Sequence, residues 1–149
     1  MPSKPVSILA SAALLLAAAT IALAAKPRAG DIYSTPSTAS PSVYFKAASP
    51  TKLADFTASL ALACKSKTCG GFGGVKSFTR ASVEVSKTGT FKVSGNILAI
   101  NNRKLGTETV TGRFVSPTLV TGKVTTHANL GEYRGVTKTY TATVVPPTS

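Results

Sequence analysis

Both cysteines of the chain lie in one glycine-rich stretch, ALACKSKTCGGFGGVKS, at residues 61–77. Four residues separate Cys64 from Cys69, so the two-residue spacing of a redox-active Cys-x-x-Cys pair is absent. Two thiolates supply half of a tetrahedral zinc site, and His127 is the one histidine that could add a neutral ligand. The spacing therefore favours a local disulfide between Cys64 and Cys69, and we expect neither a metal nor a cofactor.

The glycines of the same stretch, CGGFGG, resemble a phosphate-binding loop only in composition. The Gly-Lys-Ser/Thr ending of a nucleotide-binding loop is missing, and the dinucleotide-binding spacing is not met. We interpret the stretch as a flexible crossover between a strand that ends at Cys64 and one that begins near Arg80. Its lysines fit a solvated loop or, as the functional alternative, a site for anions: Lys65, Lys67 and Lys76.

Residues that could form a catalytic site are few. A Ser-His-Asp triad could use only His127, with Asp31 or Asp55, and no Gly-x-Ser-x-Gly elbow is present. His127 lies in TTHAN at the end of a predicted strand, where we expect it to face solvent. We therefore predict a protein that is not an enzyme. Paired carboxylates for glycoside hydrolysis would have to come from five acids, none of them in an apolar run that would raise its pKa: Asp31, Asp55, Glu84, Glu108 and Glu132.

The N-terminus has the layout of a secretory signal peptide. A short leader that carries Lys4 precedes the apolar run ILASAALLLAAATIALAA, and small residues mark a cleavage point near Ala25. A retained membrane anchor is the alternative, because about eighteen apolar residues approach the length that spans a bilayer. We therefore predict a signal peptide over residues 1–25 and a product that is secreted or associated with the cell envelope, with no membrane span after cleavage.

The chain is strongly basic, with 17 Lys and Arg against 5 Asp and Glu and a formal net charge of +12. Such a field favours polyanions, including anionic envelope polymers, extracellular nucleic acid and acidic polysaccharide, without selecting one of them. Lysines on the outer faces of strands also keep β proteins soluble. Aromatic residues beside cations are few, with Tyr44 near Lys46 and Tyr133 next to Arg134, so no specific nucleic-acid partner is expected.

Composition divides the chain after the signal into three parts. Residues 26–42 are rich in Pro, Ser and Thr, which predicts a linker or an extended arm, with a short edge strand possible over residues 31–34. Residues 43–145 alternate apolar and polar side chains and predict one β domain. Residues 146–149 form a short tail. The length after the signal, about 125 residues, suits a single core.

Period-two alternation is the main structural signal. VEV at 83–85 and FKV at 91–93 predict a hairpin that turns at SKTG, and we expect a further turn at Ser94-Gly95-Asn96. TETVTGRFVSPTLVTGKVTTHA predicts a second hairpin that turns at Ser116-Pro117. VTKTYTATVV predicts a last strand with threonines on one face and Tyr140 on the other. The pattern predicts an all-β fold, an antiparallel meander of about seven to nine strands in a single sandwich or barrel.

One segment, TKLADFTASLALAC at residues 51–64, has two interpretations. As a strand it places Phe56, Ala58 and Leu60 on one face. As a helix opened by Thr51 it groups Leu53 with Phe56 and Leu60, and alanine is a good helix former. We favour the strand because the surrounding sequence is β, and the helix stays an alternative.

Several stretches together resemble small secreted β proteins of high-GC bacteria: GDIY, VYFKA, LADFTASLALAC, VSKTGTFKVSG, VTGRFVSPTLVTGKV and KTYTATV. The resemblance covers nearly the whole mature chain and rests on turn and strand patterns. It implies a secreted β fold and assigns no activity. The resembling proteins often have a cysteine shortly before the last strand, where this chain has Tyr133, so the resemblance implies that a local bridge replaces a long-range one.

Three functions are compatible with the sequence. We favour a secreted, non-enzymatic β module that adheres to anionic polymer. A small-ligand carrier is the alternative, since an eight-stranded barrel can hold one small molecule, although the chain has no Trp for an aromatic pocket. An unrecognised secreted hydrolase is the third. A filled core with cations gathered on one face favours adhesion, and a continuous apolar cavity favours the carrier.

Overall fold

The computed structural model describes residues 23–66 and 75–146, and these residues form an all-β, antiparallel fold. Among them there is no helix long and apolar enough to cross a membrane. The strands, in chain order, are β1 (Ile32–Ser34), β2 (Ser42–Ser49), β3 (Lys52–Ser59), β4 (Ala63–Cys64), β5 (Val75–Lys76), β6 (Phe78–Glu84), β7 (Thr90–Ala99), β8 (Lys104–Ser116), β9 (Leu119–Ala128), β10 (Tyr133–Arg134) and β11 (Thr137–Val144).

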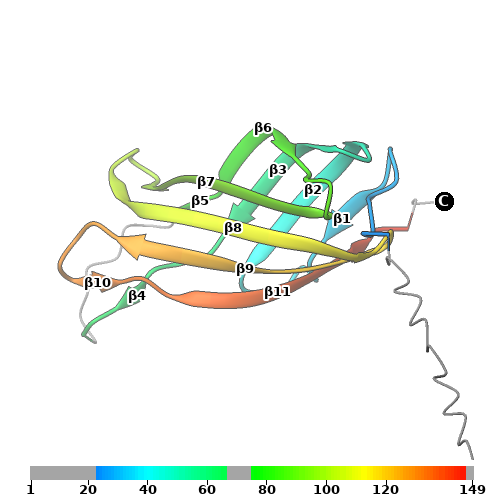
Figure 1. The fold of residues 1–149 in the computed structure, drawn as a ribbon. Helices are drawn as coiled ribbons and strands as arrows, with labels where there is room; N and C mark the ends of the chain where they lie inside the picture. The colour runs from blue at the N-terminus through cyan, green and yellow to red at the C-terminus, as the bar shows by residue number, and fades with distance from the viewer. Residues whose placement is uncertain (1–22, 67–74, 147–149) are drawn as a thin grey trace, which may run out of the picture.

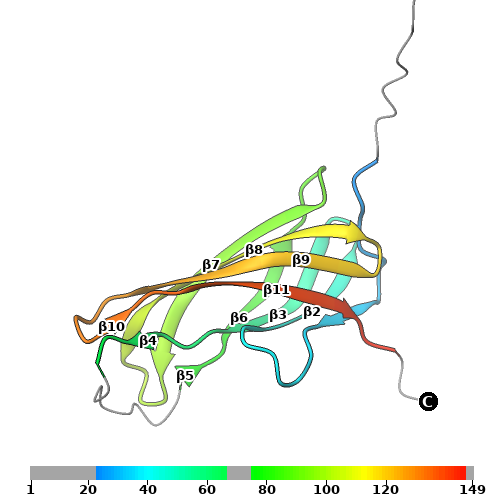
Figure 2. The same ribbon diagram turned by 90° about the horizontal axis from the view of Figure 1, so that it is seen from below.

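Nine of these strands form one curled sheet in the order β5-β7-β8-β9-β11-β1-β2-β3-β6. Ser77 alone separates β5 from β6, so residues 75–84 are nearly one strand, which pairs with β7 at its start and with β3 over the rest. This stretch joins the two edges of the sheet into a nearly closed barrel (Figure 1). The short strands β4 and β10 pair with each other at one end of the barrel (Figure 2).

Side chains bridge the seam where β6 and β7 are not paired. The Arg80 guanidinium donates a hydrogen bond of 2.7 Å to the Ser94 carbonyl and lies 4.7 Å from the centre of the Phe78 ring. The Phe78 ring lies against Gly95, where a Cβ would come within 2.1 Å of a ring carbon. Gly95 therefore allows this ring to close the barrel where backbone pairing does not.

An aromatic cluster fills the interior. The ring of Phe45 stacks on Tyr33 with a centroid distance of 5.1 Å and on Phe56 at 5.7 Å, and it meets Phe91 and Phe114 edge to face at 5.6 and 6.2 Å. Of these residues Tyr33, Phe45 and Phe56 are completely buried. Edge-to-face and offset pairs are the favoured contacts between rings, so the cluster combines burial with specific geometry.

A bulge in β3 aligns two apolar side chains with this cluster. Opposite Phe45, the pairing register between β2 and β3 shifts by one residue, and Asp55 adopts a positive φ of 51°. The extra residue lets both Leu53 and Phe56 face the interior, and both are fully buried. Aspartate tolerates this backbone region better than most residues, which accounts for a charged residue at the bulge.

Most strand predictions are confirmed. The hairpin at SKTG, the turn at Ser116-Pro117 and the final strand are present, and residues 51–64 form β3 and β4 rather than a helix. The predicted turn at Ser94-Gly95-Asn96 was wrong, because β7 continues to Ala99 and Gly95 makes room for Phe78.

The short strand considered possible within residues 26–42 is present as β1, but its expected place at an edge was wrong. β1 lies between β11 and β2, and Tyr33 in this strand is completely buried. Composition misled here because one aromatic anchor is enough to hold a Pro-rich and Ser-rich segment in a barrel.

Truncating the central ring tests this packing. Phe45→Ala should lower the free energy of unfolding by about 3 to 5 kcal/mol, since it removes a buried ring that contacts four others. Tyr44→Ala is the matched control, because Tyr44 precedes it on β2 and is 39% exposed, and it should cost less than about 1 kcal/mol. Equilibrium denaturation measures both, and equal losses would contradict a core centred on Phe45.

Candidate functional site

Of the stretch singled out by the sequence, the structure describes residues 61–66 and 75–77, and β4 within it pairs with β10 at one end of the barrel (Figure 2). Lys76 and Lys104 flank Leu98 from either side in the sheet register. The Lys76 ammonium donates a 2.6 Å hydrogen bond to the Asn102 side chain, and the Lys65 amide donates to the Glu132 carbonyl. We call this surface the basic end and define it by five cations: Lys65, Lys76, Arg103, Lys104 and Arg134.

Two of the sequence-based predictions for this loop stay predictions. Cys69 and Lys67 lie outside the described residues, so the structure tests neither the disulfide between Cys64 and Cys69 nor the grouping of Lys67 with Lys65 and Lys76. Cys64 lies in β4 and is paired in register with Tyr133 of β10.

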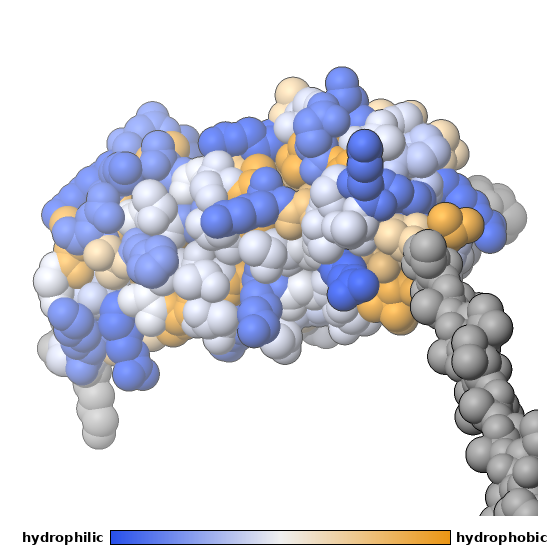
Figure 3. All heavy atoms as spheres, in the orientation of Figure 1, coloured by the Kyte–Doolittle hydropathy of each residue, from blue (hydrophilic) through white to orange (hydrophobic). Residues whose placement is uncertain are grey.

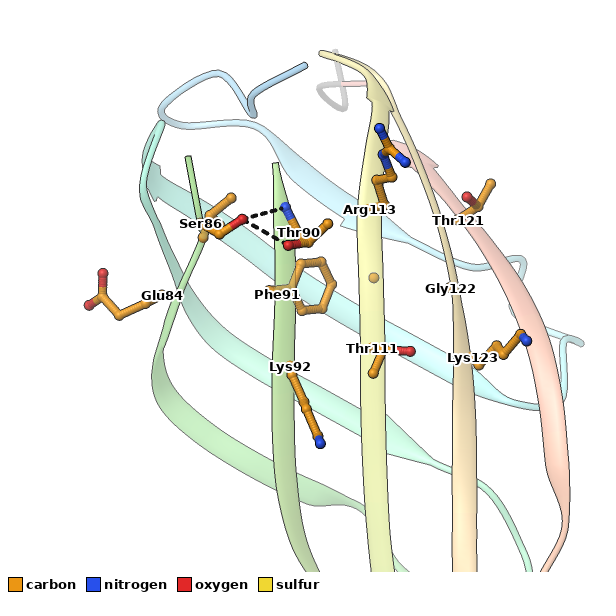
Figure 4. A pocket seen from close by; sticks show the side chains of 12 residues that line it. Glu84, Ser86, Thr90, Phe91, Lys92, Thr111, Arg113, Thr121, Gly122 and Lys123 are labelled. Carbon is orange, nitrogen blue, oxygen red and sulfur yellow. Dashed lines mark hydrogen bonds between the residues drawn. The ribbon is translucent and has the colours of Figure 1, made fainter. Parts of the chain in front are cut away.

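A second basic surface, which the sequence analysis did not identify, crosses the outside of β7, β8 and β9 (Figure 4). It is a shallow depression of about 770 Å³, bounded on one side by the end of β6. We call it the outer groove. Three cations from three neighbouring strands alternate with threonines along it: Lys92, Arg113 and Lys123 with Thr90, Thr111 and Thr121.

The strand register arranges these six side chains as a checkerboard. One row across the sheet reads Lys92, Thr111, Lys123, and the next reads Thr90, Arg113, Thr121. Each cation therefore has a threonine beside it on the adjoining strand. This arrangement depends on the residue-by-residue register of β7, β8 and β9. The alternation within each strand does not determine that register, so the sequence analysis could not predict the arrangement.

Glycines inside the barrel support the floor of the outer groove. Gly112 and Gly122 are paired in register, and a Cβ at Gly112 would come within 2.3 Å of the Phe91 ring and 2.6 Å of the Tyr140 hydroxyl. The two rings thus lie directly against the inner side of the strands that carry the cations. This packing makes the floor of the groove rigid.

A polar layer divides the interior into two apolar clusters. Glu108 on β8 is paired in register with Thr126 on β9 and with Gly95 on β7, and it is 2% exposed. The aromatic cluster lies on one side of this layer, and a smaller cluster around Ile97 and Leu105 lies on the other.

Burial governs the acidity of Glu108. Desolvation raises the pKa of this carboxyl from its ordinary value of 4.5 to about 7, and a hydrogen bond from the Leu60 backbone opposes the rise. One carboxyl oxygen, Oε1, has no hydrogen-bond partner among the described residues. The expectation that none of the five acids has a raised pKa was therefore wrong for Glu108. It failed because GTETVTG has polar residues along the sequence, whereas the barrel surrounds Glu108 with residues of other strands.

Two buried tyrosines differ in how their hydroxyls are satisfied. The Tyr33 hydroxyl donates a hydrogen bond to the Pro117 carbonyl. The Tyr140 hydroxyl is buried without a partner among the described residues, and burial raises the pKa of this phenol. A buried hydroxyl without a partner destabilises the fold. The stabilising contribution of Tyr140 therefore comes from the packing of its ring.

The residues considered for catalysis do not come together. His127 is exposed on β9, and Asp55 is exposed on β3, four strands away around the sheet. Glu84 forms an ion pair with Lys52 at 3.7 Å, Asp31 is half-buried just before β1, and Glu132 is exposed just before β10. Among the described residues no group of three or more His, Cys, Asp or Glu could hold a metal ion. No protein-family model, curated protein or solved structure matches the chain.

The buried carboxyl makes stability depend on pH. Because folding raises the pKa of Glu108 from 4.5 to about 7, its protonated form is favoured by folding, so stability is greatest below about 4.5 and falls as the pH rises towards 7. At pH 8 the loss should be on the order of 3 kcal/mol. Glu108→Gln should remove this loss, so that the variant is the more stable protein at pH 8.

Denaturant midpoints measured from pH 4 to pH 8 test this effect, with Glu84→Gln as the control for an exposed acid. A wild-type stability that does not fall across this range, or a Glu108→Gln variant less stable than wild type at pH 8, would show that Glu108 is ionised at no cost.

The two tyrosine hydroxyls predict opposite effects of the same substitution. Tyr140→Phe should raise the free energy of unfolding by about 1 kcal/mol, because it removes a buried group without a partner. Tyr33→Phe should lower it by a similar amount, because the Pro117 carbonyl loses its donor. Thermal unfolding of the pair distinguishes the two, and a destabilised Tyr140→Phe would mean that the hydroxyl has a partner.

Proposed function

We propose that the protein is an extracytoplasmic, non-enzymatic β-barrel module that adheres to anionic polymer of the cell envelope or its surroundings. The filled interior is the observation that supports this most strongly. Five aromatic rings occupy the space that a carrier would keep for its ligand: Tyr33, Phe45, Phe56, Phe91 and Phe114. A barrel with such a core binds through its outer surface, and that surface is basic.

The charges of the outer surface favour polyanions over other partners. Of the 5 acids in the chain, Glu108 is buried and Glu84 is paired with Lys52, so few carboxylates offset the 17 Lys and Arg. A positive surface gains affinity for a polyanion mainly by releasing the counterions of the polymer. The predicted signal peptide places the module where envelope and extracellular polymers occur.

The alternatives receive less support. A carrier needs a cavity, and the depressions found among the described residues lie on the surface of the barrel. A hydrolase needs an acid and a second catalytic group close together. Burial raises the pKa of Glu108, but this carboxyl shares its layer with Thr126 and Gly95 rather than with a second carboxylate.

Retention on a charged matrix tests adhesion. The purified protein should be retained on carboxymethyl cellulose at physiological ionic strength and pass through unsubstituted cellulose, because the attraction depends on charge. Raising the salt should release it steeply, as counterion release requires. Elution from the charged matrix below physiological salt would show that the positive charge serves solubility alone. A stoichiometric gain in fluorescence with an apolar dye would instead favour the carrier.

A further inference from the structure

We propose that the outer groove binds an acidic polysaccharide whose charged units alternate with neutral sugar units. This inference rests on the proposed adhesion to anionic polymer, and it names both the surface and the class of polymer. It concerns the checkerboard of three cations and three threonines on β7, β8 and β9 (Figure 4).

The three cations of the outer groove have no partner among the residues that the structure describes. Lys92, Arg113 and Lys123 form no hydrogen bond or ion pair with the rest of the described chain, and all three are exposed. Other cations do have internal partners, since Lys52 pairs with Glu84 and Arg80 binds the Ser94 carbonyl. The groove thus presents three uncompensated charges on a rigid sheet.

The basic end is less suited to the same task. Lys76 is engaged by the Asn102 side chain at 2.6 Å, and Glu132, which is exposed, adjoins Lys65 through the backbone hydrogen bond between them. A polyanion would have to displace the hydrogen bond between Lys76 and Asn102, and it would be repelled by the carboxylate of Glu132. The outer groove has one acid at its rim, Glu84, and Lys52 already pairs with it.

The spacing of the cations fits anions that are separated along a polymer. Lys92 and Lys123 lie two strands apart, which is roughly 10 Å between their backbones, and Thr111 lies between them. Arg113 lies in the next row, where its guanidinium can bind a carboxylate or sulfate through two hydrogen bonds. The hydroxyls of Thr111 and Thr121 beside these cations can bind the hydroxyls of neutral sugar units, whereas the Thr90 hydroxyl is engaged by the Ser86 hydroxyl at 2.8 Å.

The groove continues into a second depression, which favours a chain over a small ligand. A hollow of about 310 Å³ lies beside β11, between its threonines and residues 35–41. Lys123 of the groove is paired in register with Thr139 of this hollow, and Thr121 with Thr141. Figure 3 shows the face that carries β8 and β9, where the middle of the surface is largely of intermediate hydropathy with separate hydrophilic patches on it.

The lining of the groove disfavours nucleic acid. Single-stranded nucleic acids are held by bases that stack on exposed aromatic rings. Phe91 is the one aromatic residue that lines the groove, and it is 4% exposed with its ring turned into the core. Polyphosphate is disfavoured for a different reason. Its anions are contiguous, so it has no neutral units that could bind the threonines between the cations.

The first experiment compares two triple variants that lose the same charge. Lys92→Gln/Arg113→Gln/Lys123→Gln removes the cations of the groove, and Lys65→Gln/Lys76→Gln/Lys104→Gln removes three from the basic end. Hyaluronan, with one carboxylate per disaccharide, is the probe, and dextran is the uncharged control. The groove variant should lose at least about tenfold in affinity. The slope of its log affinity against log salt should also decrease in magnitude by roughly two. The end variant should stay within about threefold of wild type. Because the two variants have the same net charge and hence the same long-range attraction, a difference between them reports on the groove itself.

A second pair of variants tests the hydroxyls with the charge unchanged. Thr111→Val and Thr121→Val keep the shape and strand preference of threonine, and each should weaken hyaluronan binding by about fivefold, the equivalent of one hydrogen bond. Binding of inorganic polyphosphate should not change. Thermal unfolding of the groove variants should match wild type, because their substituted side chains lie on the outer face of the sheet.

The outcomes separate this inference from the proposed function. If wild type binds neither hyaluronan nor polyphosphate at physiological salt, adhesion itself fails. If the end variant loses binding and the groove variant does not, adhesion stands and the groove is overturned. If the groove variant loses binding but polyphosphate and oligothymidylate bind as tightly as hyaluronan, or the threonine variants bind normally, the alternating polysaccharide is overturned.

Discussion

The stacking of aromatic rings around Phe45 is the contact on which the rest of the structure depends. An antiparallel barrel of this size has an interior just wide enough for side chains, so its contents decide whether it carries a ligand or is solid. Phe45 contacts four rings that come from β1, β3, β7 and β8, so a single cluster ties strands from around the barrel together. Two local irregularities adapt the backbone to these rings. The bulge at Asp55 turns Leu53 and Phe56 inward together, and Gly112 leaves room for Phe91.

The same packing explains why the proposed binding surface lies outside. The strands that hold Phe91 and Tyr140 against their inner side display the cations and threonines of the outer groove on their outer side. A sheet backed by a filled core holds these side chains at fixed spacing, which suits a repeating polymer better than a flexible loop does. Glu108 lowers the stability of this core, because a carboxyl in the interior destabilises the fold when it ionises.

Much of the fold could be predicted from the sequence, and the candidate site could not. Alternation along single strands identified the hairpin at SKTG and the hairpin that turns at Ser116-Pro117, because each depends on neighbours in the chain. Gly95 was wrongly predicted as part of a turn. The residue that requires a glycine there is Phe78, which lies on another strand more than ten residues away in the chain. The raised pKa of Glu108 and the row of Lys92, Thr111 and Lys123 across three strands likewise depend on register between strands, which the pattern of one strand does not determine.

The central claim is that the barrel is solid and binds through its outer face. An NMR titration of isotopically labelled protein with an acidic polysaccharide tests it most directly, since it reports on every position at once. We expect the amides of Thr111, Arg113 and Lys123 to shift together while the ring and methyl signals of Phe45, Phe56 and Val110 stay in place. Shifts concentrated in those interior signals, with the amides of β7, β8 and β9 unchanged, would show that the barrel opens to a ligand and would contradict the account.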